Sequence, residues 1–109
     1  MIDRVETPVT TVLCDLDGVV WLARRAIPGA ADAVARLRHA GCRVVFVTNN
    51  SGDRIETQEL ALGAIGIPAE GHVVTSAMAA ARLIGAGDRV FVCGGGGIAE
   101  AVTGRGAEL

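Results

Sequence analysis

The 109-residue chain contains no lysine and no tyrosine, and its aromatic side chains are limited to one tryptophan and two phenylalanines. All ten basic residues are arginine, so chemistry that needs a side-chain amine cannot run on this polypeptide alone. The formal net charge is −2 and no block of like charges occurs, so neither nucleic acid nor a membrane surface is expected as a partner. No apolar run reaches the roughly 20 residues that a membrane span needs.

Cysteine is also scarce. The three cysteines, Cys14, Cys42 and Cys93, are an odd number without CxxC spacing, which indicates a reducing, cytoplasmic location. Residues 1–11 are polar and acidic, unlike a signal peptide. In contrast, half of the residues are hydrophobic, which is enough to build the core of one small domain.

Short β-branched runs alternate with alanine-rich stretches of helical pattern, which is typical of an α/β fold with a Rossmann-like parallel sheet and flanking helices. The first run is continuously apolar, so we expect a strand buried on both faces. We expect Gly41 to end the first helix and Ser76 to cap the third. The predicted strands are 10–14, 43–47, 72–75 and 89–93, the predicted helices are 30–40, 55–65, 77–84 and 98–103, and residues 19–27 are expected to form a hairpin or irregular flap.

Polar residues follow the first two predicted strands. Asp15 and Asp17 come after the first strand, and the period of two puts both carboxylates on one side. Thr48, Asn49 and Asn50 follow the second strand and offer donors suited to phosphate oxygens. Because ligands bind beyond the carboxyl ends of parallel strands, these residues predict a site for Mg²⁺ and phosphate there. Read one at a time, the same residues are also ordinary turn formers.

The segments around these residues resemble the haloacid dehalogenase-like (HAD) hydrolase superfamily. Residues 12–21 (VLCDLDGVVW) are similar to its first motif, and residues 44–51 (VVFVTNNS) are similar to its second. The VTNNS form and the later residues 74–77 (VTSA) resemble the branch that contains NagD and the 4-nitrophenylphosphatases. The similarity extends over nearly the whole chain.

The resemblance implies a Mg²⁺-dependent phosphatase that hydrolyses a small phosphorylated metabolite through a phospho-aspartate. It implies that Asp15 attacks phosphorus and that Asp17 protonates the leaving oxygen and later activates water. The Asp15 carboxylate and the backbone carbonyl of Asp17 would also bind Mg²⁺. It further implies that Thr48 and the N–H of Asn49 hold phosphate oxygens, with Asn50 shaping the same loop.

The chain also departs from the family pattern. The family's lysine motif, its second acidic motif and the cap domain of this branch have no counterpart here. Residues 1–109 are therefore expected to form the N-terminal part of a HAD-like core domain, incomplete and without its cap. We expect the isolated chain to be inactive and to associate, either with a second copy or with a complementing C-terminal half.

Two other functions fit parts of the sequence. Without lysine, the chain could be a non-catalytic fragment that binds phosphate or a partner protein. Residues 94–99 (GGGGIA) also fit a relaxed dinucleotide fingerprint between a strand and a helix. That fingerprint needs an acidic residue about 20 positions further on, which this chain does not contain, so dinucleotide binding ranks below the other functions.

Overall fold

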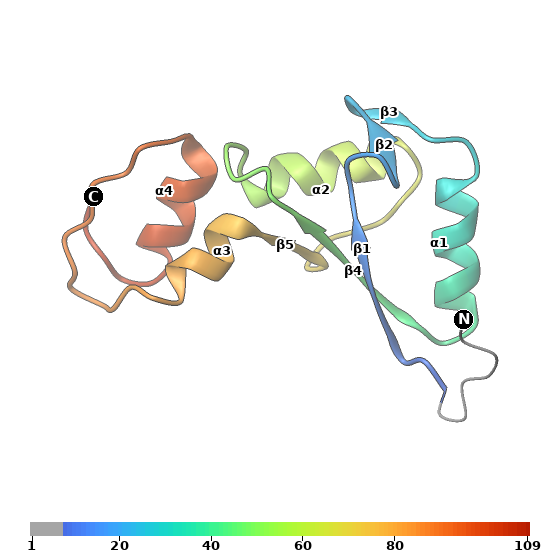
Figure 1. Cartoon of the computed structure of the whole chain (residues 1–109), viewed down its shortest axis with the longest axis horizontal. Coiled ribbons are helices and arrows are strands. Elements are labelled where there is room, and N and C mark those ends of the chain that lie inside the picture. The colour runs from blue at the N-terminus through green and yellow to red at the C-terminus, as the bar shows by residue number, and fades with distance from the viewer. Residues whose placement is uncertain (1–7) are drawn as a thin grey trace.

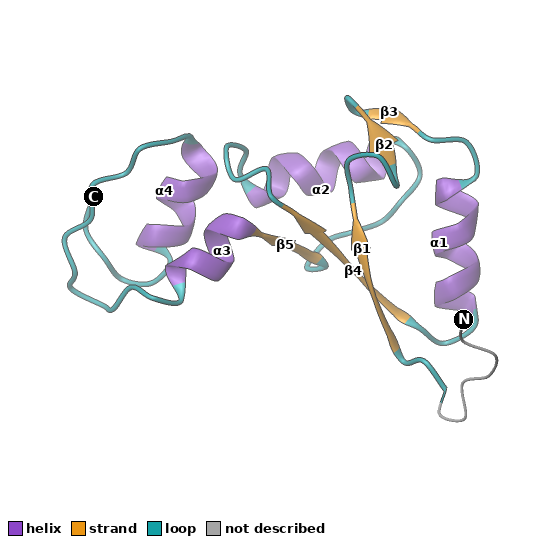
Figure 2. Ribbon diagram, in the orientation of Figure 1, coloured by secondary structure: helices purple, strands orange, loops and turns teal. Residues whose placement is uncertain are grey.

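The computed structural model describes residues 8–109, and a three-stranded parallel sheet lies at its centre (Figure 1). The strand order is β1-β4-β5, and a separate antiparallel hairpin consists of β2 and β3. The strands are β1 (Thr11–Asp15), β2 (Trp21–Leu22), β3 (Arg25–Ala26), β4 (Arg43–Thr48) and β5 (Val73–Thr75). The helices are α1 (Ala30–His39), α2 (Ile55–Ala64), α3 (Ser76–Ala81) and α4 (Gly96–Thr103) (Figure 2). The predicted parallel α/β fold with flanking helices is confirmed.

The hydrophobic core lies on one face of this sheet. Val34 of α1 and Leu62 of α2 belong to the same buried cluster as Val44 and Phe46 of β4. The strand order β1-β4-β5 advances in one direction, and α1 and α2, which connect these strands, pack into the same cluster. The fully buried Trp21 of the hairpin closes one end of the cluster.

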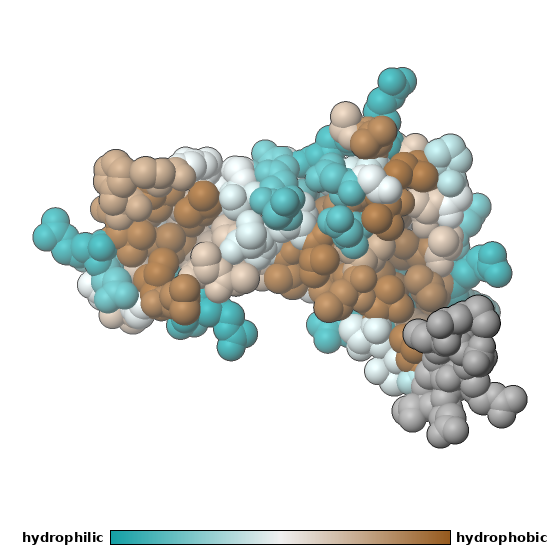
Figure 3. All heavy atoms as spheres, in the orientation of Figure 1, coloured by the Kyte–Doolittle hydropathy of each residue, from teal (hydrophilic) through white to brown (hydrophobic). Residues whose placement is uncertain are grey.

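The opposite face of the sheet is open within the described residues. Leu13 lies on this face opposite Val45, and 70% of its surface is exposed. The prediction that the first strand is buried on both faces is therefore wrong: α1 and α2 both cover the other face, and β1 is at the edge of the described sheet. Figure 3 shows hydrophobic side chains gathered over the strands and again over the α3–α4 end of the molecule.

The helix ends follow the local sequence signals with one correction. Gly41 adopts a φ of 94° directly after α1, and the next residue, Cys42, donates its N–H to the Leu37 carbonyl, as in a Schellman cap. The predicted cap of the third helix is wrong by one residue. Because β5 runs directly into α3, Thr75 and not Ser76 accepts the N–H of Met78, at 3.2 Å.

The predicted fourth strand, residues 89–93, does not form in the described structure. Only one isolated parallel bridge is present there, between Arg89 and Glu108. A β-branched run becomes a strand only where a neighbouring strand pairs with it, and Phe91 remains 90% exposed. The segment instead packs beside α3 and α4, where Val90 and Val92 line an apolar pocket.

The open face predicts that the 109-residue chain associates with itself, because an unpaired edge strand with exposed apolar side chains favours contact with another copy. We expect dimers or larger species in sedimentation velocity, and a shift toward monomer for Leu13→Lys. Leu83→Lys, at a position that is 90% exposed but lies beyond α3, is the control and should leave association unchanged. A wild-type chain that stays monomeric at the same concentration would contradict this prediction.

Candidate functional site

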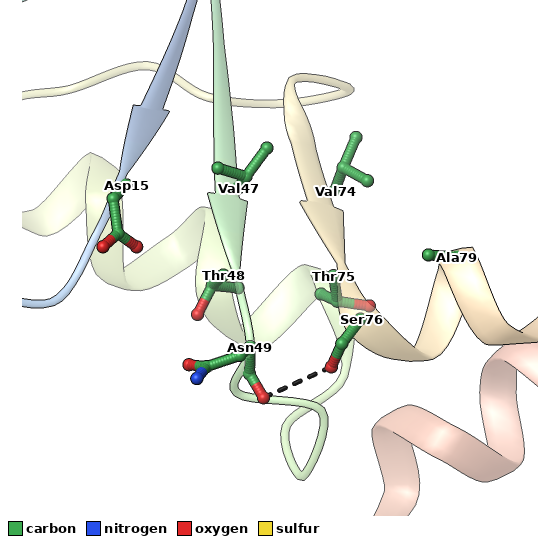
Figure 4. Close-up of a pocket in the computed structure, with 8 residues that line it drawn as sticks. All are labelled: Asp15, Val47, Thr48, Asn49, Val74, Thr75, Ser76 and Ala79. Carbon is green, nitrogen blue, oxygen red and sulfur yellow. Dashed lines mark hydrogen bonds between the residues drawn. The ribbon is translucent and has the colours of Figure 1, made fainter.

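A pocket of about 460 Å³ lies at the carboxyl ends of β1, β4 and β5. This is the edge at which ligands bind in parallel α/β sheets. The pocket is floored by apolar side chains of the open sheet face and rimmed by polar ones. Its lining residues are Asp15, Val47, Thr48, Asn49, Val74, Thr75, Ser76 and Ala79 (Figure 4).

Asp15 is the last residue of β1 and lies opposite Val47 in the parallel register. Its Oδ1 accepts a hydrogen bond from the N–H of Leu16 at 2.9 Å, and the fully buried Leu16 side chain anchors the backbone at this point. The carboxylate is exposed and has no ion-pair partner within the described residues. Asp15 therefore presents a solvent-accessible carboxyl group on a backbone that Leu16 anchors.

Thr48 ends the neighbouring strand and is 7% exposed. Its hydroxyl oxygen accepts the N–H of Asn50 at 3.1 Å. Because this bond occupies a lone pair and not the hydroxyl proton, the proton remains available for donation to a ligand. Figure 4 shows the side chains of Asp15, Thr48 and Asn49 extending into the same space beyond the ends of β1 and β4.

The two asparagines after Thr48 have different environments. Asn49 lines the pocket, and its carbonyl accepts the hydroxyl of Ser76 at 3.3 Å. Asn50 is not among the lining residues, and each of its four polar groups makes a hydrogen bond inside the protein. This environment suits Asn50 to organising the loop.

Asp17 also lies outside the pocket lining. It is exposed and sits in the turn that follows β1. In that turn the Leu16 carbonyl accepts the N–H groups of three later residues, and Gly18 adopts a φ of 83°. The structure thus brings Asp15, Thr48 and Asn49 around one pocket. Asp17 lies outside this pocket, in the turn that follows β1.

Sequence reasoning did not assign Thr75 and Ser76 to the site, although both line the pocket. Thr75 pairs with Thr48 in the β4–β5 register, so its position follows from the strand order. In the sequence, residues 74–77 stand out only by their resemblance to one branch of the family. The signal that could have found them is the rule that every parallel strand delivers its last residues to the same edge.

The donor set at this edge is suited to a hard divalent cation. Asp15 offers a carboxylate oxygen and the resemblance implies the backbone carbonyl of Asp17 as a second oxygen, and Mg²⁺ commonly takes only one or two carboxylates together with phosphate and water. Within residues 8–109 no three His, Cys, Asp or Glu side chains are grouped closely enough to hold a metal. A cation that keeps several water ligands is the kind that such a small set of protein oxygens fits.

The thiol beside Asp15 does not compete as a nucleophile. Burial, and secondarily the negative charge of Asp15, raise the pKa of Cys14, so the thiol is protonated at neutral pH. The thiolate, which is the reactive form, is thereby disfavoured.

The glycine-rich segment is packed against the loop that follows Thr48. A Cβ atom added to Gly97 would overlap the carbonyl oxygens of Ser51 and Asp53, and one added to Gly95 would lie 2.5 Å from the Gly52 carbonyl oxygen. The N–H of Gly97 also donates to the Gly52 carbonyl at 3.1 Å. Close backbone contact thus accounts for these glycines without a bound nucleotide.

Glu100 of α4 fixes the end of the same loop. Its Oε1 accepts the N–H of Ile55, the first residue of α2, and its Oε2 accepts Nε of Arg54, both at 3.0 Å. The backbone hydrogen bond from Ile55 and the Arg54 guanidinium lower the pKa of Glu100 below its ordinary value of 4.5. An acidic side chain at a helix N-terminus is favourable in its ionised form.

Comparison with known proteins places this site in a family. The family model described as haloacid dehalogenase-like hydrolase matches residues 12–108. The chain belongs to the haloacid dehalogenase-like hydrolases, as the motifs predicted. No helix in the described part of the chain is both long and apolar enough to cross a membrane.

Curated relatives of the chain include two that match most of it. Chronophin from Mus musculus is 40% identical over 111 residues, which cover 90% of this chain and 37% of chronophin. An acid sugar phosphatase from Staphylococcus saprophyticus is 37% identical over 101 residues, which cover 89% of this chain and 39% of that protein. The chain thus spans well under half the length of these relatives.

Solved structures give the same result. The glycerol phosphate phosphatase of Mycobacterium tuberculosis, solved in complex with magnesium, has a TM-score of 0.83 and 32% identity, covering 92% of this chain and 31% of that one. NagD from E. coli K-12 has a TM-score of 0.83 and 25% identity, covering 94% and 42%. The predicted similarity to the NagD and 4-nitrophenylphosphatase branch is confirmed.

The packing of the glycine segment predicts a selective effect of adding one methyl group. Gly97→Ala should destabilise the protein by about 1–3 kcal/mol, because the methyl group overlaps backbone atoms that have no free space to move into. Gly96→Ala is the matched control, since its Cβ would meet only the Arg54 side chain at 3.5 Å. Urea denaturation of both variants checks this, and equal stability of the two would refute the packing argument.

The lowered pKa of Glu100 predicts a pH-dependent contribution to stability. The ionised carboxylate stabilises the fold above pH 4.5, the ordinary pKa, and this contribution is lost as the pH falls through the lowered pKa. Glu100→Gln should therefore melt several degrees below the wild type near pH 7, with a smaller difference in strong acid. Melting curves across pH 3–7 measure this, and a difference independent of pH would contradict it.

Proposed function

We propose that residues 1–109 form the N-terminal part of the core domain of a Mg²⁺-dependent phosphomonoesterase that acts on a small phosphorylated metabolite. The observation that carries this proposal is the placement of Asp15 and Thr48 at the ends of neighbouring parallel strands, around one pocket. Membership of the hydrolase family supports it, as do relatives named acid sugar phosphatase and glycerol-3-phosphate phosphatase.

Asp15 is the proposed nucleophile. One of its carboxylate oxygens forms a bond to phosphorus while the bond from phosphorus to the ester oxygen breaks, which yields a phospho-aspartate. Asp17 gives its proton to the departing oxygen, so the alcohol leaves neutral. Asp17 then takes a proton from water, and the resulting hydroxide attacks phosphorus, releasing inorganic phosphate and restoring Asp15.

Thr48 and Asn49 are proposed to hold the phosphoryl oxygens. The hydroxyl proton of Thr48 is available because its oxygen already accepts the N–H of Asn50. The Asn49 N–H is the second proposed donor. Such donors act on charge that increases in the transition state, in a site where the hydroxyl is largely shielded from water.

The Asp15 carboxylate and the backbone carbonyl of Asp17 would hold the magnesium ion, which leaves the Asp17 carboxyl group free to donate and accept a proton. Bound Mg²⁺ supplies positive charge that neutralises the phosphate oxygens and keeps the nucleophile ionised. A cytoplasmic location is also proposed, and three free cysteines support it.

For the isolated chain we propose phosphate binding without efficient turnover. The chain has no lysine to compensate the charge of the phosphoryl group, and electrostatic stabilisation is the main catalytic contribution at such sites. A small phosphorylated ligand is the proposed partner of the pocket, whose rim carries Asp15, Thr48 and Asn49.

The nucleophile assignment makes a direct prediction for the complete enzyme. Asp15→Asn should reduce kcat for 4-nitrophenyl phosphate at least a thousandfold, because the amide cannot form the covalent intermediate, as is typical when a nucleophile is lost. Asp32→Asn, in the first turn of α1 away from the pocket, is the control and should retain wild-type kcat. Full activity of Asp15→Asn would rule out the mechanism.

A further inference from the structure

The hairpin formed by β2 and β3 has a strained turn. Its two turn residues, Ala23 and Arg24, adopt φ values of 50° and 65°. Two-residue hairpin turns of this kind normally use glycine or asparagine, because other side chains are disfavoured in the left-handed region. A backbone conformation of this kind persists only where surrounding contacts hold it.

The contacts that hold this turn come from the Arg24 side chain. Its guanidinium carbon lies 4.6 Å from the centroid of the buried Trp21 ring, and its Nη2 pairs with Oδ2 of Asp53. Asp53 belongs to the loop after Thr48, 29 residues further along the chain. The left-handed turn thus directs the Arg24 guanidinium toward the loop that follows Thr48.

Asp53 connects Arg24 to Asn50 through a shared carboxylate oxygen. The same Oδ2 atom accepts Nδ2 of Asn50 at 3.2 Å. The remaining groups of Asn50 are fixed by Gly52, which donates to Oδ1, and by the buried Gln58, which donates to the carbonyl. The Asn50 N–H is then directed at the Thr48 hydroxyl oxygen.

We propose that Arg24 and Asp53 are positioning residues, which fix Asn50 and through it the orientation of the Thr48 hydroxyl toward phosphate. This inference rests on the proposed phosphate-binding role of Thr48. Neither residue lines the pocket, so their effect reaches the ligand only through the chain of hydrogen bonds. The carboxylate of Asp53 is the necessary link, because it accepts from both Arg24 and Asn50.

The test uses the complete enzyme with Arg24→Met and Asp53→Ala. Arg25→Met is the control, since Arg25 is exposed and its side chain makes no hydrogen bond or ion pair within the described residues. Inorganic phosphate should bind roughly three- to tenfold more weakly to the first two variants, the size expected for one hydrogen bond, and normally to the control. Unchanged phosphate affinity in Arg24→Met would overturn the proposal.

A double-mutant comparison separates positioning from general stability. In a Thr48→Val background the Arg24→Met change should produce no further loss of phosphate affinity, because the hydroxyl it positions is absent. The charge-exchanged pair, Arg24→Asp with Asp53→Arg, keeps opposite charges at the two positions but should not recover phosphate affinity, since Arg cannot accept from Asn50. The positioning role would be contradicted if the losses of phosphate affinity from Arg24→Met and Thr48→Val multiplied in the double variant. Recovery of phosphate affinity in the charge-exchanged pair would also contradict it.

Hydrogen exchange at the Asn50 amide gives a readout that needs no ligand. Its exchange should become faster in Arg24→Met and Asp53→Ala and stay unchanged in Arg25→Met. Unchanged exchange would overturn the positioning inference even in an active phosphatase. Faster exchange in an enzyme that neither binds nor releases phosphate would instead overturn the proposed function.

Discussion

The parallel pairing of β1 with β4 is the constraint on which the site depends. The register puts Asp15 opposite Val47, so Thr48 emerges one residue beyond the aspartate at the same edge of the sheet. Two residues 33 positions apart in the sequence thereby line one pocket. The crossover through α1 covers the other face of the sheet, so the pocket opens on the side that the helices leave free.

Beyond the strand ends, the site is held by a loop with little secondary structure of its own. Residues 49–54 receive contacts from two distant parts of the chain: Arg24 of the hairpin, and α4, through its first glycines and Glu100. Each contact joins a distant part of the chain to the loop. These contacts support an irregular segment at the point where the proposed role of Thr48 requires a fixed hydroxyl group.

The sequence was sufficient to predict what depends on local pattern. The parallel α/β pattern and the Gly41 cap followed from periodicity and turn residues, and the structure has both, while residues 19–27 take the hairpin form of the two alternatives. The proposed chemical roles of Asp15, Asp17, Thr48 and Asn49 remain predictions. The motif spacing could place these residues at one edge, but it could not show that Asp17 lies outside the pocket.

Features that depend on contacts between distant segments could not be predicted from the sequence. The β-branched run at 89–93 has the composition of a strand, yet it pairs through a single bridge and leaves Phe91 exposed. The four glycines match a nucleotide fingerprint, yet Gly97 is explained by backbone contact with Ser51 and Asp53. Strand propensity and motif matching do not say which other segment will pack against a given run of residues.

The central claim is that Asp15 carries the phosphoryl group during turnover. The direct measurement is mass spectrometry of the complete enzyme, quenched in acid during steady-state hydrolysis of a phosphate ester and digested. The account predicts one phosphoryl group on the peptide that contains Asp15, absent when substrate is omitted. A phosphoryl group on any other residue in a fully active enzyme would contradict it.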